Sequence, residues 1–246
     1  MKIEFAEDAN AYRITLNDPP LNILDIAMLE ELGDALVRVK NDKHCLIIRA
    51  AGAKAFSAGA SVQDHVGDRV VTMLQHFHEC FRILAKLDIV TMAFVNGVAL
   101  GGGCELALAC DFILASDRSR FAQPEINLGV FPPVAAYQLS RQMPPRKGLE
   151  LLLTGDPVDA SVIANAVFPT AEFDARAEEW LEKIYKQSAS SLRFAKRAFR
   201  LAQNADFDER LARVERLYLE ELMKTHDANE GLAAFIEKRK PAWTGR

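Results

Sequence analysis

The stretch Ile89–Asp111, I-V-T-M-A-F-V-N-G-V-A-L-G-G-G-C-E-L-A-L-A-C-D, constrains the fold of this chain more than any other. It begins as an apolar run typical of a strand, passes through a turn with four glycines, and continues as a helix of small residues, Cys104–Ala109. A strand that turns on glycine into a helix leaves backbone N–H groups without partners at the positive end of the helix dipole. We therefore expect a site where an oxyanion forms and a proton moves, beside Glu105.

The glycine turn does not match the known phosphate-binding patterns. Its glycines run G-x-x-x-G-G-G from Gly97, not G-x-G-x-x-G, and no Gly-Lys-Ser/Thr follows. By itself Gly101–Gly103 could equally be a tight joint between a strand and a helix. Glu105 is harder to explain, because Leu106–Ala109 indicate a helix buried on most sides, where a carboxylate is costly unless it is paired or functional. A dipole partner or cap at the helix N-terminus is the alternative.

A second carboxylate, Glu125, lies between Pro124 and Ile126 in an otherwise apolar or amide context. Two carboxylates that flank one cavity can divide the roles of acid and base, and such a pair titrates jointly. A glutamate on a surface loop is the plain alternative. The two glutamates are therefore candidate catalytic residues on sequence grounds, without any assignment of the proton to either.

Alternating apolar patterns predict an α/β core for residues 1–185 and helices alone in residues 186–246. Ala51–Ala60 is expected to be a loop of small residues, and periodic apolar positions continue through Leu211, Val214, Leu217 and Leu219. The expected strands are Ile3–Phe5, Tyr12–Leu16, Cys45–Ala50, Ile89–Val95 and Phe112–Ala115, and the expected helices cover about 26–40, 69–86, 134–141 and 146–153.

Composition excludes some classes of function. The net charge of −4 argues against general binding of nucleic acid, and Asn96, the glycines and Glu105 interrupt the longest apolar run, so we expect no membrane span. The N-terminus has no apolar leader, and the four cysteines form no C-x-x-C pair, which predicts reduced thiols in a cytoplasmic protein.

Other polar clusters have plain explanations. His76 and His78 do not share a helix face, so no metal site is expected there. His65 lies in a polar loop beside Asp64 and could line a pocket. A basic stripe on the last part of the chain predicts a solvated helix face, with a membrane or nucleic-acid surface as the alternative; it comprises Arg193, Lys196, Arg197 and Arg200.

Several motifs in the right order resemble the enoyl-CoA hydratase/isomerase (crotonase) superfamily over nearly the whole chain. They are A-F-S-A-G-A (Ala55–Ala60), Val95–Asp111, F-A-Q-P-E-I-N-L-G (Phe121–Gly129) and Glu230–Lys240. The resemblance implies an α/β spiral of ββα units with a helical C-terminal trimerisation region, assembled as a homotrimer or a dimer of trimers. It implies an acyl-CoA substrate that brings its own coenzyme A, with no separate cofactor and no metal.

The resemblance also implies roles for individual residues. The N–H groups of Ala60 and Gly102 form an oxyanion hole, and each such donor can contribute about 3–4 kcal/mol. Glu125 is the main proton donor to the α-carbon and Glu105 orients and activates water; the presence of both favours hydration. The residues expected to bind the substrate are Leu21, Leu24, Ala58, Ser61, Val62, Leu100, Gly101, Pro124, Val130 and Phe131, with Lys238, from a neighbouring subunit, as a phosphate contact.

One segment departs from the general hydratases. Where they usually continue with a glycine-rich run, this chain has F-P-P-V-A-A-Y (Phe131–Tyr137). Together with Pro19–Leu32 and Asp64–Asp68, this segment resembles the cyclohexa-1,5-diene-1-carbonyl-CoA hydratases of anaerobic aromatic degradation. It predicts a hydro-lyase with an acyl pocket shaped for a flat ring. The alternatives are a short-chain enoyl-CoA hydratase or enoyl-CoA isomerase of fatty-acid β-oxidation, and a non-catalytic acyl-CoA or RNA-binding relative.

Overall fold

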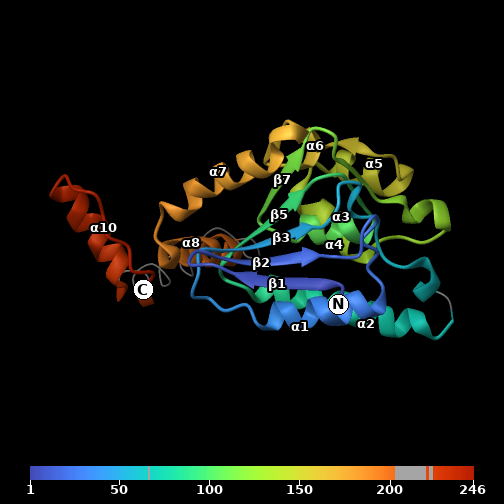
Figure 1. Cartoon of the computed structure of the whole chain (residues 1–246), viewed down its shortest axis with the longest axis horizontal. Coiled ribbons are helices and arrows are strands. Elements are labelled where there is room, and N and C mark those ends of the chain that lie inside the picture. The colour runs from blue at the N-terminus through green and yellow to red at the C-terminus, as the bar shows by residue number, and fades with distance from the viewer. Residues whose placement is uncertain (66, 203–219, 222–223) are drawn as a thin grey trace.

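The structure, a computed structural model, describes residues 1–65, 67–202, 220–221 and 224–246 (Figure 1). Its larger sheet contains six strands in the order β1-β2-β3-β5-β7-β10, and β1 alone runs antiparallel to its neighbour. These strands are β1 (Ile3–Glu7), β2 (Ala11–Leu16), β3 (Cys45–Ala50), β5 (Val90–Val95), β7 (Phe112–Ser116) and β10 (Ala166–Phe168).

A smaller sheet lies beside it, with four short strands in the order β4-β6-β8-β9. These are β4 (Ala55–Ser57), β6 (Val98–Leu100), β8 (Arg120–Ala122) and β9 (Val158–Asp159). The chain alternates between the sheets: each long strand β3, β5 and β7 is followed by a short strand β4, β6 and β8, and then by helical structure. This repeat is the spiral of ββα units that the resemblance implied.

Helices fill the remaining layers. The 3₁₀ turns are η1 (Val62–His65), η2 (Pro124–Leu128) and η3 (Thr170–Glu172), and the α-helices are α1 (Ile26–Val37), α2 (Arg69–Lys86), α3 (Gly102–Leu108), α4 (Pro133–Gln142), α5 (Pro145–Thr154), α6 (Ala160–Ile163), α7 (Phe173–Tyr185), α8 (Ala189–Leu201) and α10 (His226–Ile236). In Figure 1, α1 and α2 cover one side of the large sheet and α7 lies on the other. Asp25 caps α1 as expected, since its side chain accepts from Met28 N at 2.9 Å.

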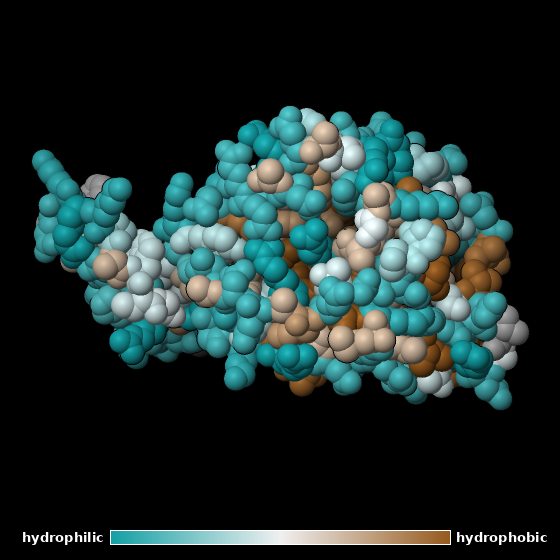
Figure 2. All heavy atoms as spheres, in the orientation of Figure 1, coloured by the Kyte–Doolittle hydropathy of each residue, from teal (hydrophilic) through white to brown (hydrophobic). Residues whose placement is uncertain are grey.

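The core explains why β5 sits at the centre of the fold. All six residues of β5 are buried, because one face contributes to the cluster with α1 and α2 and the other contacts the cluster built with Phe173 and Leu181 of α7. α3 is likewise buried on all sides, at all seven residues. Figure 2 shows hydrophobic spheres gathered at the right of the view, at the end of the molecule opposite α10.

Some expectations need correction. The expected loop Ala51–Ala60 contains β4, and β8 was not anticipated, because strands of three residues show no periodicity. The expected helix Cys104–Ala109 begins at Gly102. The expected apolar positions Leu211, Val214, Leu217 and Leu219 lie outside the described residues. The division at residue 185 falls between α7 and α8 and stays a prediction.

The basic stripe of α8 is not a solvated face. Lys196 Nζ donates to Ile89 O at 2.6 Å and lies 2.5 Å from Asp111, and its side chain is only 8% exposed. Arg200 donates to Leu87 O at 3.0 Å. These cations attach α8 to the amino end of β5, and burial lowers the pKa of Lys196. The partners of Lys196, Asp111 and the carbonyl of Ile89, are distant in sequence, so local periodicity does not reveal them.

Candidate active site

The glycine turn forms a corner into which other side chains fit closely. Gly101 has φ of +50° and ψ of −123°, a backbone conformation that favours glycine. A Cβ at Gly101 would lie 2.3 Å from Glu125 Oε1, and a Cβ at Gly102 would lie 2.9 Å from the Phe77 ring and 3.2 Å from Ala60 N. Only glycine therefore allows the second carboxylate and the loop of Ala60 to approach the start of α3.

Ala60 and Gly102 each present a backbone N–H at this corner. Leu24 N donates to Gly59 O at 3.0 Å and Ser61 N donates to Leu24 O at 3.2 Å, so the N–H of Ala60 points to the opposite side of that pairing. Gly102 is the first residue of α3, and its N–H has no acceptor within the helix. Within the described part of the chain, neither N–H donates to a protein oxygen. The pair has the composition of an oxyanion hole.

Glu105 is a buried carboxylate with one firm partner. Its side chain is 2% exposed, and Ala135 N donates to Glu105 Oε1 at 2.6 Å. Ala135 is the third residue of α4, so Glu105 caps the N-terminus of α4 rather than that of its own helix. Burial raises the pKa of Glu105 to about 8, and the charge of Glu125 adds to this, while the Ala135 N–H opposes it. The carboxyl therefore exchanges a proton near neutral pH.

Glu125 lies in the first turn of η2, half-buried against Gly101. Its Oε2 is buried and has no hydrogen-bond partner among the described residues. Burial raises its pKa, and the positive charge of His65 lowers it. Because burial raises the pKa of both neighbouring carboxyls, the pair can act as one proton donor and one acceptor.

The two segments expected to bind coenzyme A lie side by side. Ala58 N donates to Leu21 O at 2.9 Å, and Leu24 forms a parallel bridge with Ala60. Val62, 59% exposed, follows at the start of η1. Ser61, whose N–H bonds to Leu24 O, completes the group. The structure thus brings these predicted residues together beside the first oxyanion donor.

The predicted residues at the acyl end flank Gly101 and Glu125 in sequence. Leu100 precedes Gly101 at the end of β6, and Pro124 directly precedes Glu125 in η2. Val130 and Phe131, 46% and 69% exposed, lie between η2 and α4. Phe131 therefore presents an apolar surface next to the helix that Glu105 caps.

Lys238 is the predicted residue that the structure does not bring to this site. It follows α10, with φ of +56°, and α10 lies beyond α8 at the other end of the molecule from α4 and α5 (Figure 1). A phosphate contact from Lys238 stays a prediction that requires a second copy of the chain.

Three residues of the site escaped the sequence argument. Asn22 is fully buried, and its Nδ2 donates to Ala51 O at 3.0 Å and to Ala55 O at 2.9 Å, which holds the loop of Ala60 against residues 18–24. Asp64 is 2% exposed and accepts from Ile26 N at 3.2 Å. Phe77 packs against Gly102. Asn22 after Pro19-Pro20 was a usable turn signal, whereas Asp64 and Phe77 gave none.

The described ranges contain no group of three metal-ligating side chains, and His76 instead lies 3.4 Å from Glu30 on the neighbouring helix. None of the helices described here combines the length and the apolar character that crossing a membrane demands. All four cysteines are free and buried, as expected for reduced core thiols.

Comparison with known proteins identifies a family and relatives that match this chain. Residues 6–246 match the family model of enoyl-CoA hydratase/isomerase. The chain is 37% identical over 255 residues to a cyclohexa-1,5-dienecarbonyl-CoA hydratase of Thauera aromatica, which covers 100% of this chain and 97% of the relative. It is also 37% identical over 243 residues to a probable enoyl-CoA hydratase of Mycobacterium tuberculosis, covering 95% of this chain and 94% of the relative.

Solved structures agree with the fold. The structure of an enoyl-CoA hydratase from Bacillus anthracis superposes with a TM-score of 0.93 at 29% identity and covers 100% of both chains. A human enoyl-CoA hydratase domain-containing protein superposes with a TM-score of 0.91 at 28% identity, covering 99% of this chain and 100% of the other.

Proposed function

The chain belongs to the enoyl-CoA hydratase/isomerase family, and we propose that it hydrates a cyclic dienoyl-CoA, cyclohexa-1,5-diene-1-carbonyl-CoA. It is an enzyme of the hydro-lyase type, as are the relatives named enoyl-CoA hydratases. Such an enzyme adds water across a double bond conjugated with a thioester. The presence of two carboxyls beside two free N–H donors supports hydration as the reaction of this chain.

The reaction begins when the thioester oxygen binds between Ala60 N–H and Gly102 N–H. Both donors are in place before the reaction, so they stabilise the negative charge that develops on this oxygen. Glu105 takes a proton from water, and the resulting hydroxyl forms a C–O bond at the β-carbon. Glu125 donates its proton to the α-carbon, and solvent then restores the proton of Glu125 and removes that of Glu105.

Two contacts support this division of roles. The Ala135 N–H at 2.6 Å and the N-terminus of α4 oppose the larger effect of burial, which raises the pKa of Glu105 to about 8, so this carboxyl can lose its proton near neutral pH and act as a base. Glu125 Oε2 is buried and has no partner among the residues that the structure describes, and a neutral carboxylic acid is less costly to bury in that state than a carboxylate. Glu105 is therefore assigned as the base for water and Glu125 as the proton donor.

The conformation of the segment before α4 is the observation that best supports the proposal of a ring-shaped substrate. Pro132 caps α4 and Pro133 is its first residue, so the backbone at the acyl end is stiffened on both positions. Phe131 is 69% exposed directly before them and offers a flat apolar surface. A planar ring fits such a surface better than a flexible chain, and the Thauera relative matches the whole of this chain.

A short-chain enoyl-CoA hydratase is the second candidate. It is supported by the 37% identity to the Mycobacterium relative, a probable enoyl-CoA hydratase, and by 33% identity to a short-chain-enoyl-CoA hydratase of Clostridium acetobutylicum. The two candidates separate when purified enzyme is given cyclohexa-1,5-diene-1-carbonyl-CoA and crotonyl-CoA in turn. We expect a higher kcat/KM for the cyclic diene by about tenfold or more. A preference for crotonyl-CoA by orders of magnitude would exclude the ring assignment.

Isomerisation is tested on the same samples. In water enriched in heavy oxygen, hydration places the label in the product and isomerisation does not.

We further propose that the chain works as a homotrimer or a dimer of trimers, in which Lys238 reaches the coenzyme A phosphates of a neighbouring copy. Lys238→Ala should then raise KM for the thioester and leave kcat unchanged.

A further inference from the structure

We propose that Gln138 is a positioning residue of the hydration reaction, whose amide binds the backbone of Glu105 and so fixes this base against α4. The proposal rests on the proposed function, because it gives Gln138 a part in the activation of water assigned to Glu105. It applies equally to a ring-shaped and to a linear acyl group.

Gln138 is a buried amide on the face of α4 that packs against α3. Its side chain is 6% exposed, and it lies three residues after Ala135, whose N–H donates to Glu105 Oε1 at 2.6 Å. Residues three apart in a helix share a face. Gln138 therefore lies on the side of α4 that already holds the carboxyl of Glu105.

The Gln138 amide bridges two backbone groups of α3, Glu105 O and Ala109 N. With its nitrogen towards the carbonyl, it donates to Glu105 O at 3.3 Å and accepts from Ala109 N at 3.1 Å. The reverse orientation would place oxygen against oxygen and nitrogen against nitrogen, so the bonds themselves fix the orientation. Ala109 N also donates to Glu105 O at 2.9 Å, and the amide thus joins the helical turn that begins at Glu105.

A third contact continues the same stripe along α4. Gln142, four residues after Gln138, donates from Nε2 to Leu108 O at 3.0 Å. The contacts of Ala135, Gln138 and Gln142 therefore run from the carboxyl of Glu105, through its backbone, to the last residue of α3. The first two touch Glu105, and the third lies one helical turn beyond it.

These bonds matter because burial alone does not orient a base. All seven residues of α3 are buried, but apolar contacts have no preferred direction. Ala135 N–H fixes the carboxyl of Glu105 only while α3 and α4 keep their spacing, and Gln138 ties the backbone of Glu105 to the same helix. A catalytic group must be held within about 0.5 Å of its productive position, and an error of about 1 Å can cost about 100-fold in rate.

The kinetic test removes one amide at a time from α4. Methionine is close to glutamine in length but has no amide, so Gln138→Met deletes both bonds to the turn of Glu105. We expect kcat to fall about 10–100-fold while KM changes by less than about twofold, because Ala60 and Gly102 still bind the thioester oxygen. Gln142→Met is the control, since it deletes a bond between the same two helices; its kcat should stay within about twofold of the wild type.

A bond that merely holds α3 and α4 together would make the two variants alike. Equal kcat values in Gln138→Met and Gln142→Met would overturn the proposal, and so would a loss carried by KM with kcat unchanged. If Gln138→Met does not fold, Gln138→Asn takes its place. Its amide is one methylene shorter and cannot bridge the same two groups, so the same fall in kcat is expected.

A second measurement does not depend on turnover. Hydrogen exchange of the Ala135 amide in the unliganded enzyme, followed by NMR, reports the bond to Glu105 directly. Its protection should fall about tenfold in Gln138→Met and keep the wild-type value in Gln142→Met. Equal protection in all three proteins would overturn the proposal even if no thioester were hydrated. Failure of the proposed function alone would appear as an inactive wild type with this difference intact.

Discussion

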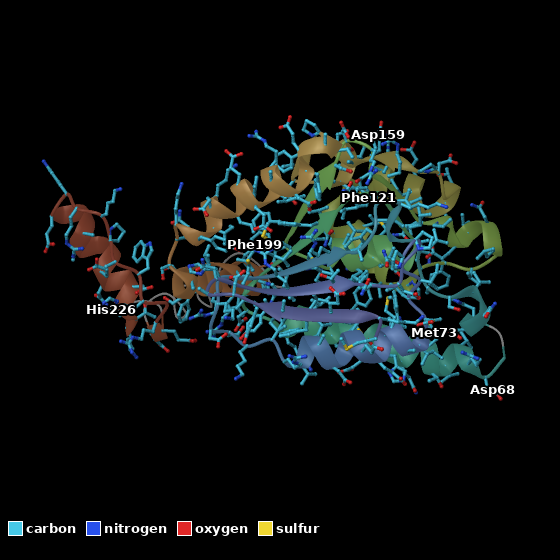
Figure 3. The ribbon with its side chains drawn as sticks, in the orientation of Figure 1. Asp68, Met73, Phe121, Asp159, Phe199 and His226 are labelled. Carbon is cyan, nitrogen blue, oxygen red and sulfur yellow. The ribbon has the colours of Figure 1, made fainter. Side chains whose placement is uncertain are left out.

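Two buried carboxylates, Glu105 on α3 and Asp227 on α10, have opposite surroundings. Glu105 is 2% exposed and accepts one hydrogen bond at 2.6 Å from Ala135 N. Asp227 of α10 is 1% exposed and accepts from Ser188 Oγ at 2.5 Å, Thr244 N at 2.8 Å and Gly245 N at 2.8 Å. Its neighbour His226 is labelled in Figure 3 at the far end from Asp68 and Met73.

Because the two carboxyls have different hydrogen-bond donors, their pKa values shift in opposite directions. Burial raises the pKa of Glu105 to about 8, whereas the hydrogen bonds to Asp227, led by that of Ser188, hold its pKa well below the usual range in spite of burial. Asp227 stays ionised and fastens the C-terminal tail to the start of α8. Glu105 can exchange a proton near neutral pH. Burial alone therefore does not mark a catalytic carboxyl; the number of donors around it decides.

The largest expected effect is on kcat, which should fall steeply in a variant of Glu105 and little in a variant of Asp227. Glu105→Gln keeps an oxygen for Ala135 N but cannot take a proton, so kcat should fall by about 10²–10⁴-fold. Asp227→Asn should change kcat of the folded enzyme by less than about threefold, because Asp227 bonds to Ser188, Thr244 and Gly245 and to neither catalytic carboxyl. Steady-state kinetics on both variants checks this, and a comparable loss of kcat in the two would remove the contrast.

Glu105 and Asp227 should affect the pH dependence of the free energy of unfolding in opposite directions. A carboxyl whose pKa is raised by folding stabilises the folded state at low pH, and this contribution is lost as pH rises from about 4.3, the unfolded value, through about 8. Glu105→Gln removes that loss, so its advantage in free energy of unfolding over the wild type should grow between pH 5 and pH 8. Urea unfolding at several pH values measures it, and a constant difference would contradict the raised pKa.

Asp227 should show the reverse behaviour. Its lowered pKa stabilises the folded state above the unfolded value of about 3.9, and this contribution is lost as pH falls towards the folded value. Asp227→Asn should therefore lower the free energy of unfolding at pH 7 by about 2–3 kcal/mol, since hydrogen bonds to a charged acceptor are lost. Unfolding by urea at pH 7 gives the value, and an unchanged midpoint would show that the tail contacts contribute nothing.

The smallest expected effect is on substrate preference, compared between a variant of Phe131 and a variant of Trp243 in the C-terminal tail. Phe131→Ala removes the apolar surface before α4 and should lower kcat/KM for the cyclic diene by about tenfold, with less effect on crotonyl-CoA. Trp243→Ala is the control, because Trp243 Nε1 donates to Lys186 O in the C-terminal tail. Its ratio of the two kcat/KM values should equal that of the wild type. Equal changes in both variants would mean that Phe131 does not select the ring.

Local patterns predicted the parts of the fold that depend on neighbours in sequence. The apolar run of β5, the glycine turn and α3 were all predicted from Ile89–Asp111, and the α/β core followed from the alternation of expected strands and helices. β4 and β8 were missed, because three residues are too few to show alternation. The periodicity of α8 was visible, but the burial of Lys196 was not, since Asp111 and Ile89 are distant in sequence.

The site divides in the same way. Gly101, Gly102, Glu105 and Glu125 were singled out by their own stretches of sequence, while Ala60 was joined to them through the resemblance. The cap that Glu105 gives to α4 depends on a contact with Ala135 that no local pattern indicates. The donors around Asp227, which come from α8 and from the tail, were likewise beyond prediction.

The central claim is that Glu125 donates the proton that completes hydration. Glu125→Gln should be assayed with the preferred thioester in water enriched in heavy oxygen, with product labelling followed by mass spectrometry. The account predicts that kcat falls by about 10²–10⁴-fold while KM changes little, because the oxyanion donors Ala60 and Gly102 remain. Labelled product formed at a rate near that of the wild type would contradict the account and remove Glu125 from the mechanism.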